Sequence, residues 1–249
     1  MSGLPETASA LPVLLRLCCL SVFWAGLAVG AENKHTSTLD ALLPEIEKKH
    51  GATSTLAAAF EQEKYFSFMT KPVVSKGYIL FSAPGKIRFE ITAPFGVTLL
   101  DDGKKTLRYE LVGNSWRPAQ FSGGKSMQFV MDQIGQWMQG RFSGQRDVFV
   151  LSLADDGDPN SFASLDLTPR HKQFRAVIEK IRVSVSSPPE YDVLRIEIFE
   201  PGGDRFSLIF SERRINCELP AACFEVPEAG PECLKLFENA ESHQEGRVM

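Results

Sequence analysis

The sequence predicts an α+β fold, mainly antiparallel β, in which about nine to eleven strands form one curled sheet with amphipathic helices across its concave apolar face. Three patterns support this prediction. Residues Lys86 to Thr92 alternate strictly between polar and apolar side chains, as a strand with one buried face does. The dipeptide Asp102-Gly103 favours a tight hairpin. Residues 38–50 and 124–142 instead place apolar side chains at helical spacing.

Residues 1–31 are predicted to be a signal peptide. The apolar run from Leu17 to Leu27 has the length of a signal-peptide core, Arg16 precedes it, and the small residues Val29-Gly30-Ala31 follow. The run is shorter than the roughly 20 apolar residues that a membrane-spanning helix needs. We therefore expect cleavage after Ala31 and export to the periplasm. A retained membrane anchor is the less favoured alternative.

The rest of the chain is predicted to form one domain over residues 32–230, followed by a polar C-terminal tail over residues 231–249. The net charge is −4, and acidic and basic side chains are interspersed rather than gathered in blocks. Nucleic-acid-binding proteins present a basic surface, which this composition lacks. We expect a monomer that does not bind nucleic acid.

Three cysteines remain after the predicted cleavage, namely Cys217, Cys223 and Cys233. In an oxidising periplasm an odd number predicts one disulfide and one unpaired thiol. A bond between Cys217 and Cys223 would close a short loop, but Cys233 is able to replace either partner. The pairing therefore stays open at the level of sequence.

The first helix is predicted over Thr38 to His50, with Gly51 just beyond it and Pro44 bending or restarting its first turn. Its apolar residues recur at i, i+3, i+4 and i+7 and are Leu39, Leu42, Leu43 and Ile46. The next segment, Thr53 to Lys64, is expected to begin as a helix and to pass into the first strand near Phe60.

Strands follow, with turn residues between them. Lys76 to Ser82 is apolar on both faces, and Ala83-Pro84-Gly85 turns the chain. In the next strand the predicted buried face carries Ile87, Phe89 and Ile91, and the predicted solvent face carries Lys86, Arg88 and Glu90. Val97 to Leu100 and Lys105 to Leu111 flank the Asp102-Gly103 hairpin.

A second helix is predicted over Gly124 to Phe142, between strands. Its apolar stripe consists of Met127, Val130, Met131, Ile134, Trp137 and Met138. Ordinary core packing explains such a stripe in most proteins. Methionine is also common at adaptable apolar binding sites, so the stripe remains a candidate ligand contact.

The C-terminal half resumes the strand pattern. Strands are predicted over Val148 to Leu153 and Ser164 to Thr168, and a last short strand over Cys223 to Val226. Between them, three alternating strands form a meander whose apolar positions are Ile181, Val183, Val185, Leu194, Ile196, Ile198, Phe206, Leu208 and Phe210.

The residues that catalysis or metal binding would need do not gather in the sequence. The four histidines are scattered, and none has metal-ligand spacing to another His, Cys or carboxylate. The nucleophile motif Gly-x-Ser-x-Gly is also missing. We therefore predict a protein that is not an enzyme and that needs neither a cofactor nor a metal.

The order of these elements resembles the outer-membrane lipoprotein carrier family, LolA and its relatives. The similar pieces are Phe60-Glu61-Gln62 after the first helix, Gly77-Tyr78-Ile79-Leu80-Phe81, the Pro84 turn into Lys86-Ile87-Arg88-Phe89-Glu90, and Leu99 to Tyr109. Leu165 to Pro169 and the Gly203-Asp204 hairpin are similar too. The resemblance implies an incomplete, half-open β-barrel with a helical lid, whose apolar cavity receives the acyl chains of lipoproteins that cross the periplasm.

The resemblance, together with the alternation, assigns the predicted lipid-binding residues. They are Leu42, Leu43, Ile46, Phe60, Ile87, Phe89, Ile91, Met127, Met131, Ile134, Met138, Phe206 and Leu208. The implied partners are lipoprotein or lipid acyl chains, an inner-membrane donor and an outer-membrane acceptor.

One position departs from the family. Family carriers place an arginine just before the proline of the turn, where it fastens the closed lid, and this chain has Ala83 there. The departure favours a specialised paralogue that moves another lipid. The alternative function is an envelope interaction or sensor module on the same fold, with a packed core instead of a cavity. A cavity of several hundred Å³ between helices and sheet would favour the carrier.

Overall fold

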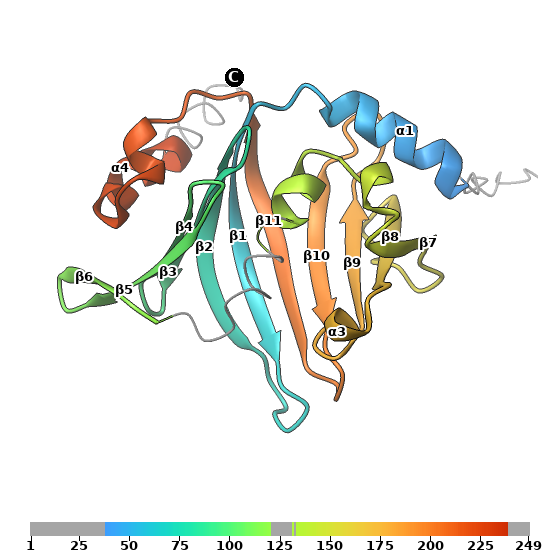
Figure 1. The fold of residues 1–249 in the computed structure, drawn as a ribbon, viewed down its shortest axis with the longest axis horizontal. Coiled ribbons are helices and arrows are strands. Elements are labelled where there is room, and N and C mark those ends of the chain that lie inside the picture. The colour runs from blue at the N-terminus through green and yellow to red at the C-terminus, as the bar shows by residue number, and fades with distance from the viewer. Residues whose placement is uncertain (1–37, 121–130, 132, 239–249) are drawn as a thin grey trace, which may run out of the picture. The chain divides into compact units, whose positions relative to one another are not determined.

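The computed structural model describes residues 38–120, 131 and 133–238. Within these residues, eleven strands form a single antiparallel sheet that curls without closing, which confirms the predicted half-open architecture (Figure 1). The spatial order is β6-β5-β4-β3-β2-β1-β11-β10-β9-β8-β7, so two meanders meet where β1 pairs with β11. The strands are β1 (Thr55–Tyr65), β2 (Val73–Ser82), β3 (Lys86–Ala93), β4 (Val97–Asp101), β5 (Thr106–Val112), β6 (Ser115–Pro118), β7 (Phe149–Leu153), β8 (Ala163–Pro169), β9 (Lys180–Val185), β10 (Val193–Phe199) and β11 (Arg205–Ile215).

Two helical segments lie over the concave face of the sheet (Figure 1). They are α1 (Leu39–His50) and the helical residues 131 and 133–138, and together they are called the lid below. The remaining short helices are η1 (Ser143–Gln145), α3 (Lys172–Arg175), η2 (Ala221–Phe224), η3 (Pro227–Ala229) and α4 (Gly230–Glu238). In the part of the chain that the structure describes, no helix has both the length and the apolar character to span a bilayer.

Helix α1 confirms the helix that the apolar period predicted. The backbone N–H groups of Ala41 and Leu42 both donate to the Thr38 carbonyl, which begins the helix. Pro44 lies inside the helix without ending it. The apolar stripe faces the sheet, and its buried members are Leu42, Leu43 and Ile46.

Three local predictions differ from the structure. Residues 55–65 are strand throughout, because β1 pairs with β2 on one side and with β11 on the other, and this pairing overrides the alanine-rich local sequence. Residues 223–226, expected to be a strand, contain the end of η2 instead. Residues 231–238 of the expected polar tail belong to α4, where Cys233 is buried. The rest of that tail lies outside the described residues.

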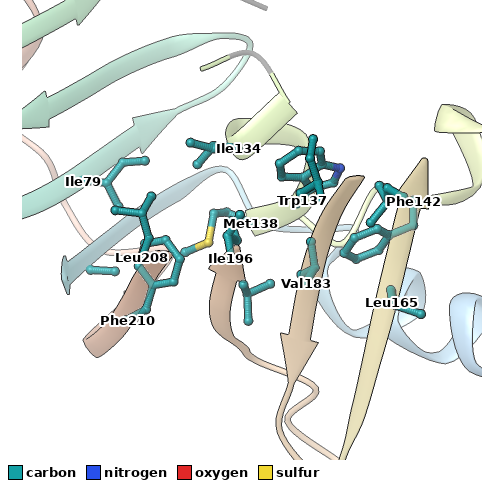
Figure 2. Packing of buried hydrophobic residues seen from close by; sticks show 14 of the residues in the cluster. Ile79, Ile134, Trp137, Met138, Phe142, Leu165, Val183, Ile196, Leu208 and Phe210 are labelled. Atoms are coloured by element: carbon teal, nitrogen blue, oxygen red, sulfur yellow. The ribbon is translucent and has the colours of Figure 1, made fainter. Parts of the chain in front are cut away.

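The main core fills the space between the lid and the concave face. Figure 2 shows lid residues Ile134, Trp137 and Met138 packed against Leu208 and Ile196 of the sheet. Phe142, Leu165 and Val183 continue the same layer toward β8 and β9. The period-two alternation of the strands therefore directs one apolar row from each strand into a shared layer.

A second, smaller core covers the outer face of β1 and β2. It is built by residues 217–238, called the strap below, which contains η2, η3 and α4. Cys223 and Cys233 of the strap form a disulfide, with Cα atoms 6.0 Å apart, and Cys217 stays unpaired. The pairing that the sequence left open is thereby resolved. Tyr78 of β2 is buried under the strap, with its ring centroid 5.8 Å from that of Phe237.

The strap also corrects the predicted solvent face of β3. Arg88 and Glu90 alternate with buried apolar residues, as predicted, yet both are buried themselves. Alternation reports that the two faces of a strand differ, and it does not report what covers the second face. Here the covering residues lie more than a hundred positions later in the sequence.

Candidate functional site

The concave face of the sheet is the candidate site, and several strands contribute to its floor. Phe60 of β1 stacks on Phe89 of β3, with ring centroids 4.6 Å apart and planes 16° apart. Gly77 of β2 makes this position possible, because a Cβ there would stand 2.7 Å from Phe60 Cζ. Leu208 of β11 and Ile87 of β3 extend the floor to either side.

The lid supplies the opposite wall. Leu42, Leu43 and Ile46 of α1 join the same apolar cluster as the floor residues. The second helical segment adds Met131, Ile134 and Met138, at the spacing that the sequence predicted. Met127, also predicted for this wall, lies outside the described residues.

All the predicted lipid-binding residues that the structure describes lie in or against this one cluster. Most of them are buried, but Ile91 and Phe206 are half-buried and pack against its margin. Ile91 lies near the end of β3, and Phe206 lies near the start of β11. In the antiparallel sheet these two positions fall toward the same end, so the apolar layer becomes accessible there.

Sequence reasoning left several residues of the layer out of the site. Trp137 and Phe142 are fully buried beside Phe149, and Trp137 had been recognised only as part of a helical stripe. The floor under β8 to β10 comes from Leu165, Leu167, Ile181, Val183 and Ile196. The alternation in those strands is the signal that marks these residues as part of the floor.

The described lid residues pack closely against the floor. A Cβ on Gly135 would stand 3.1 Å from Ile87 Cδ1 and 3.6 Å from Phe81 Cδ2, so glycine allows the second lid helix to approach β2 and β3. Side chains therefore fill this contact. An acyl chain that enters here has to displace lid side chains.

Few described hydrogen bonds hold α1 in place. The Ser143 N–H donates to Glu47 Oε1 over 2.6 Å, and Arg146 Nη2 donates to Asp40 Oδ1 over 2.8 Å. Both bonds join α1 to the segment after the second lid helix. A third bond reaches the β9–β10 loop, where His50 Nε2 lies 3.0 Å from the Tyr191 carbonyl oxygen. The lid thus meets the floor mainly through apolar contacts, which carry no directional requirement.

A hollow of about 400 Å³ lies at the edge of the lid and not over the apolar floor. Its lining includes Glu47, Gln136, Gln139 and Arg141. Gln139 is already bonded, since its Nε2 donates to the Gly135 carbonyl over 2.7 Å. Among the described residues, the lining of the hollow includes none of the predicted lipid-binding side chains, so this hollow is not the predicted acyl-chain cavity.

Ala83 stands where the family resemblance implies an arginine. Its methyl side chain cannot form the hydrogen bonds that an arginine would form at this turn. Ala83 is exposed between β2 and β3, and its backbone N–H donates to the Ser54 carbonyl over 2.8 Å. The fastening of α1 in this chain rests instead on the Glu47, Asp40 and His50 contacts described above.

The outer face under the strap is held by a buried charged network. Arg88 is 0% exposed and forms an ion pair with Glu90. Its Nη1 donates to the Cys223 and Val226 carbonyls over 3.0 Å each, and its Nη2 donates to the Pro227 carbonyl over 2.7 Å. Three strap carbonyls therefore depend on one guanidinium group.

The remaining partners complete this network. Thr98 Oγ1 donates to Glu90 Oε2 over 3.0 Å, and Arg88 Nε donates to the Tyr78 hydroxyl over 2.9 Å. Burial, and then the charge of Glu90, raise the pKa of Tyr78 well above its usual range. Tyr78 therefore stays protonated. The network faces away from the concave side and joins β3 to the strap, so its role is structural.

The other half of the outer face has its own arginine. Arg182 of β9 donates to Asp166 of β8 and to Asp156 of the β7–β8 loop, each over 2.7 Å. Burial acts against the charged form of Asp166, but hydrogen bonds from Arg182 and Lys180 outweigh it and lower the pKa of Asp166. Asp156 is exposed, so this half is only partly covered. Among the described residues, no group of three His, Cys, Asp or Glu side chains gathers as a metal site.

The comparison with known families decides the assignment. The model of the family described as "Outer membrane lipoprotein carrier protein LolA" matches residues 51–227. This chain belongs to the LolA family. The match runs from the end of α1 to η3, so it includes every strand of the sheet. The description of the family names its members as carriers of outer-membrane lipoproteins.

One curated relative agrees with this assignment, and two solved structures are similar to the chain at low identity. An "Outer-membrane lipoprotein carrier protein" of Dechloromonas aromatica (strain RCB) is 32% identical over 182 residues, which cover 72% of this chain and 80% of that protein. A LolA superfamily protein of Nitrosomonas europaea has a TM-score of 0.41 at 13% identity, covering 75% of this chain and 97% of its own. The lipoprotein LppX of Mycobacterium tuberculosis has a TM-score of 0.43 at 12% identity, covering 74% and 99%. The family assignment rests on the sequence matches and not on these scores.

Proposed function

We propose that this protein is a periplasmic carrier, released by cleavage after Ala31, that binds the acyl chains of lipoproteins or other lipids non-covalently between the lid and the concave face. It takes them from a donor at the inner membrane and delivers them to an acceptor at the outer membrane. The observation that supports this proposal is the convergence of predicted lipid-binding residues from both lid helices and from β1, β3 and β11 on one apolar layer.

The chemistry of that layer suits hydrocarbon. Burial of one CH₂ group contributes about 0.8 kcal/mol, so a long acyl chain supplies on the order of 10 kcal/mol before the entropic cost of binding is subtracted. The chain needs no polar anchor for this gain. The contacts are provided by apolar side chains of the floor such as Phe60, Phe89 and Leu208.

The lid offers the way in. In the structure, lid side chains such as Ile134 and Met138 pack against the floor residues. Their apolar contacts are exchangeable for contacts with an acyl chain of similar shape, because the hydrophobic effect depends on the area buried and not on the partner. The methionines of the second lid helix adapt readily to a changed neighbour. The free-energy cost of opening the lid is then largely offset by the apolar contacts that the acyl chain makes.

The test is direct binding by the protein purified from the periplasmic fraction of expressing cells. Native mass spectrometry should detect co-purified lipid, and a fluorescent fatty-acid probe should bind and be displaced by lipopeptide. A protein that carries no lipid and binds no probe would contradict the proposal.

A second candidate, an envelope interaction or sensor module with a closed core, is favoured by the tight approach of Gly135 to Ile87. Phe89→Glu separates the two. If the lid opens for cargo, water reaches the new carboxylate. The variant then keeps its circular dichroism spectrum but no longer binds the fatty-acid probe. If the core stays closed, the buried charge unfolds the domain. Val150→Glu, at an exposed position on β7, is the matched control and should change neither.

A further inference from the structure

Exposed apolar side chains gather at one end of the sheet. This end holds the β1–β2, β3–β4, β5–β6 and β10–β11 connections, together with α3. Phe68 on the β1–β2 connection is 80% exposed, and Phe95 on the β3–β4 connection is 78% exposed. Other exposed apolar side chains at this end are Met69, Val73, Val74, Leu111, Val112 and Val177. Clusters of exposed apolar side chains mark interaction surfaces more often than scattered ones do.

The β1–β2 connection projects beyond the neighbouring strands at the bottom of Figure 1. Residues 66–74, which comprise this connection and the first two residues of β2, are called the hairpin tip. The tip is held in shape, since the Ser67 N–H donates to Asp204 Oδ1 over 2.8 Å and the Met69 N–H donates to the Phe66 carbonyl over 2.9 Å. The rings of Phe66 and Phe68 lie 5.4 Å apart. Phe68 is therefore presented outward from a braced turn.

The composition of the hairpin tip fits the surface of a bilayer with anionic headgroups. Phe68 and Met69 are apolar groups of the kind that enter the boundary between headgroups and acyl chains. Residues 66–74 include Lys71 and no acidic side chain. Helix α3, at the same end of the sheet, adds Lys172 and Arg175. Basic side chains beside an apolar protrusion are attracted to anionic lipid, although the whole chain has a net charge of −4.

The hairpin tip is also continuous with the candidate site. Phe206 of the concave layer pairs in register with Lys64, and Lys64 pairs with Val73 of the tip. Exposure rises along this row, from buried Leu208 through half-buried Phe206 to exposed Val73. A continuous path thus runs from the floor of the concave face, across Lys64, to the tip.

We propose that the hairpin tip is a docking site for an anionic lipid bilayer. Phe68 and Met69 enter the headgroup region, and the basic side chains at this end face the headgroups. The open end of the concave layer then meets the membrane. That cargo passes along this path rests on the proposed function, whereas the docking itself does not.

The experiment is co-sedimentation of the periplasmically processed protein with vesicles of phosphatidylethanolamine and phosphatidylglycerol, compared with vesicles of phosphatidylcholine alone. Phe68→Ser combined with Met69→Ser should weaken binding to the anionic vesicles on the order of tenfold. The matched control is Leu107→Ser combined with Ile215→Ser. These side chains are 39% and 38% exposed at the opposite end of the sheet, and the control should bind as the unaltered protein does.

The outcomes are separable. Unaltered protein that ignores vesicles, or a tip variant that binds them as well as the control does, overturns the docking proposal. Fatty-acid probe binding is measured on the same samples and reports the proposed function alone. A tip variant that still binds the fatty-acid probe but no longer co-sediments with the vesicles supports the docking proposal. If no protein binds the fatty-acid probe but vesicle binding still depends on the tip, the carrier function is rejected and the docking proposal is retained.

Discussion

Phe89 and Arg88 are neighbours on β3, and both are buried, but under covers of different chemistry. Phe89 faces the lid and meets it through apolar contacts, whereas Arg88 faces the strap and holds three of its carbonyls. Apolar contacts exchange one partner for another at little cost, while a buried charge tolerates only the partners that neutralise it. The two faces of the sheet therefore differ in whether the contacts that cover them can be exchanged for contacts with another molecule. Under the proposed function the lid contacts are exchangeable for cargo, whereas the strap contacts are fixed.

Removal of the Arg88 guanidinium should produce the largest effect. Arg88→Met leaves Glu90 buried without its ion-pair partner and leaves the strap carbonyls without their donor, which should lower the free energy of unfolding by about 3–5 kcal/mol. Urea denaturation followed by tryptophan fluorescence measures this. Lys76→Ala, which breaks an exposed pair with Glu61, is the control and should change less than about 1 kcal/mol. Equal effects would remove the distinction between the two covers.

Truncation in the lid should cost less and should be partly offset by ligand. Met138→Ala removes a buried side chain and should lower the free energy of unfolding by about 3 kcal/mol. A saturating fatty acid should stabilise Met138→Ala more than it stabilises the unaltered protein, since the acyl chain also fills the vacated space, whereas it should stabilise Arg88→Met and the unaltered protein by equal amounts. Thermal melts with and without ligand test the contrast. A ligand-induced shift of the same size in both variants would count against it.

Reduction of the strap disulfide should have a moderate effect confined to the outer face. Opening the bond between Cys223 and Cys233 frees a loop of about ten residues, which corresponds to roughly 2.5 kcal/mol of unfolded-state entropy. Cys223→Ser with Cys233→Ser should show that loss in chemical denaturation. Fatty-acid probe affinity should stay within about twofold, and a larger change would link the strap to the concave face.

The smallest effect is expected at Asp166, on the partly covered half of the outer face. Because the folded-state pKa of Asp166 is lowered, its contribution is present above the unfolded pKa of about 4 and is lost as the pH falls through the folded value. Solvent screening keeps this contribution below about 1 kcal/mol. Asp166→Asn should flatten the acid side of a plot of stability against pH below about pH 4, while leaving the slope above pH 5 unchanged. An unchanged acid limb would contradict the assignment.

The sequence was sufficient to predict the concave face and insufficient for the outer one. The period of two placed Ile87 and Phe89 correctly, because a strand can bury one side only by directing every second residue toward it. The helical period did the same for Ile46 and Met138. Arg88 was assigned to solvent because its partners lie on the strap, and nothing local to β3 reports a segment so distant in sequence.

Two further differences have identifiable causes. Helix propensity in Leu56 to Ala59 favoured a helix, but β1 gains backbone pairing from both neighbours and a helix would lose it. The cysteine pairing was open because all three possible loops were short enough to close. The strap geometry, which brings α4 back over η2, selects Cys223 with Cys233.

Gly230, the first residue of α4, sets a practical limit on where the chain can be shortened. A Cβ at this position would stand 2.7 Å from Glu90 Oε1 and 3.0 Å from Arg88 Nη2, so the chain passes directly over the ion pair. A protein cut here would keep Cys223 without its partner and would uncover Tyr78, whose aromatic neighbour is Phe237. Recombinant protein for binding studies should therefore extend through Glu238, with any purification tag attached beyond it.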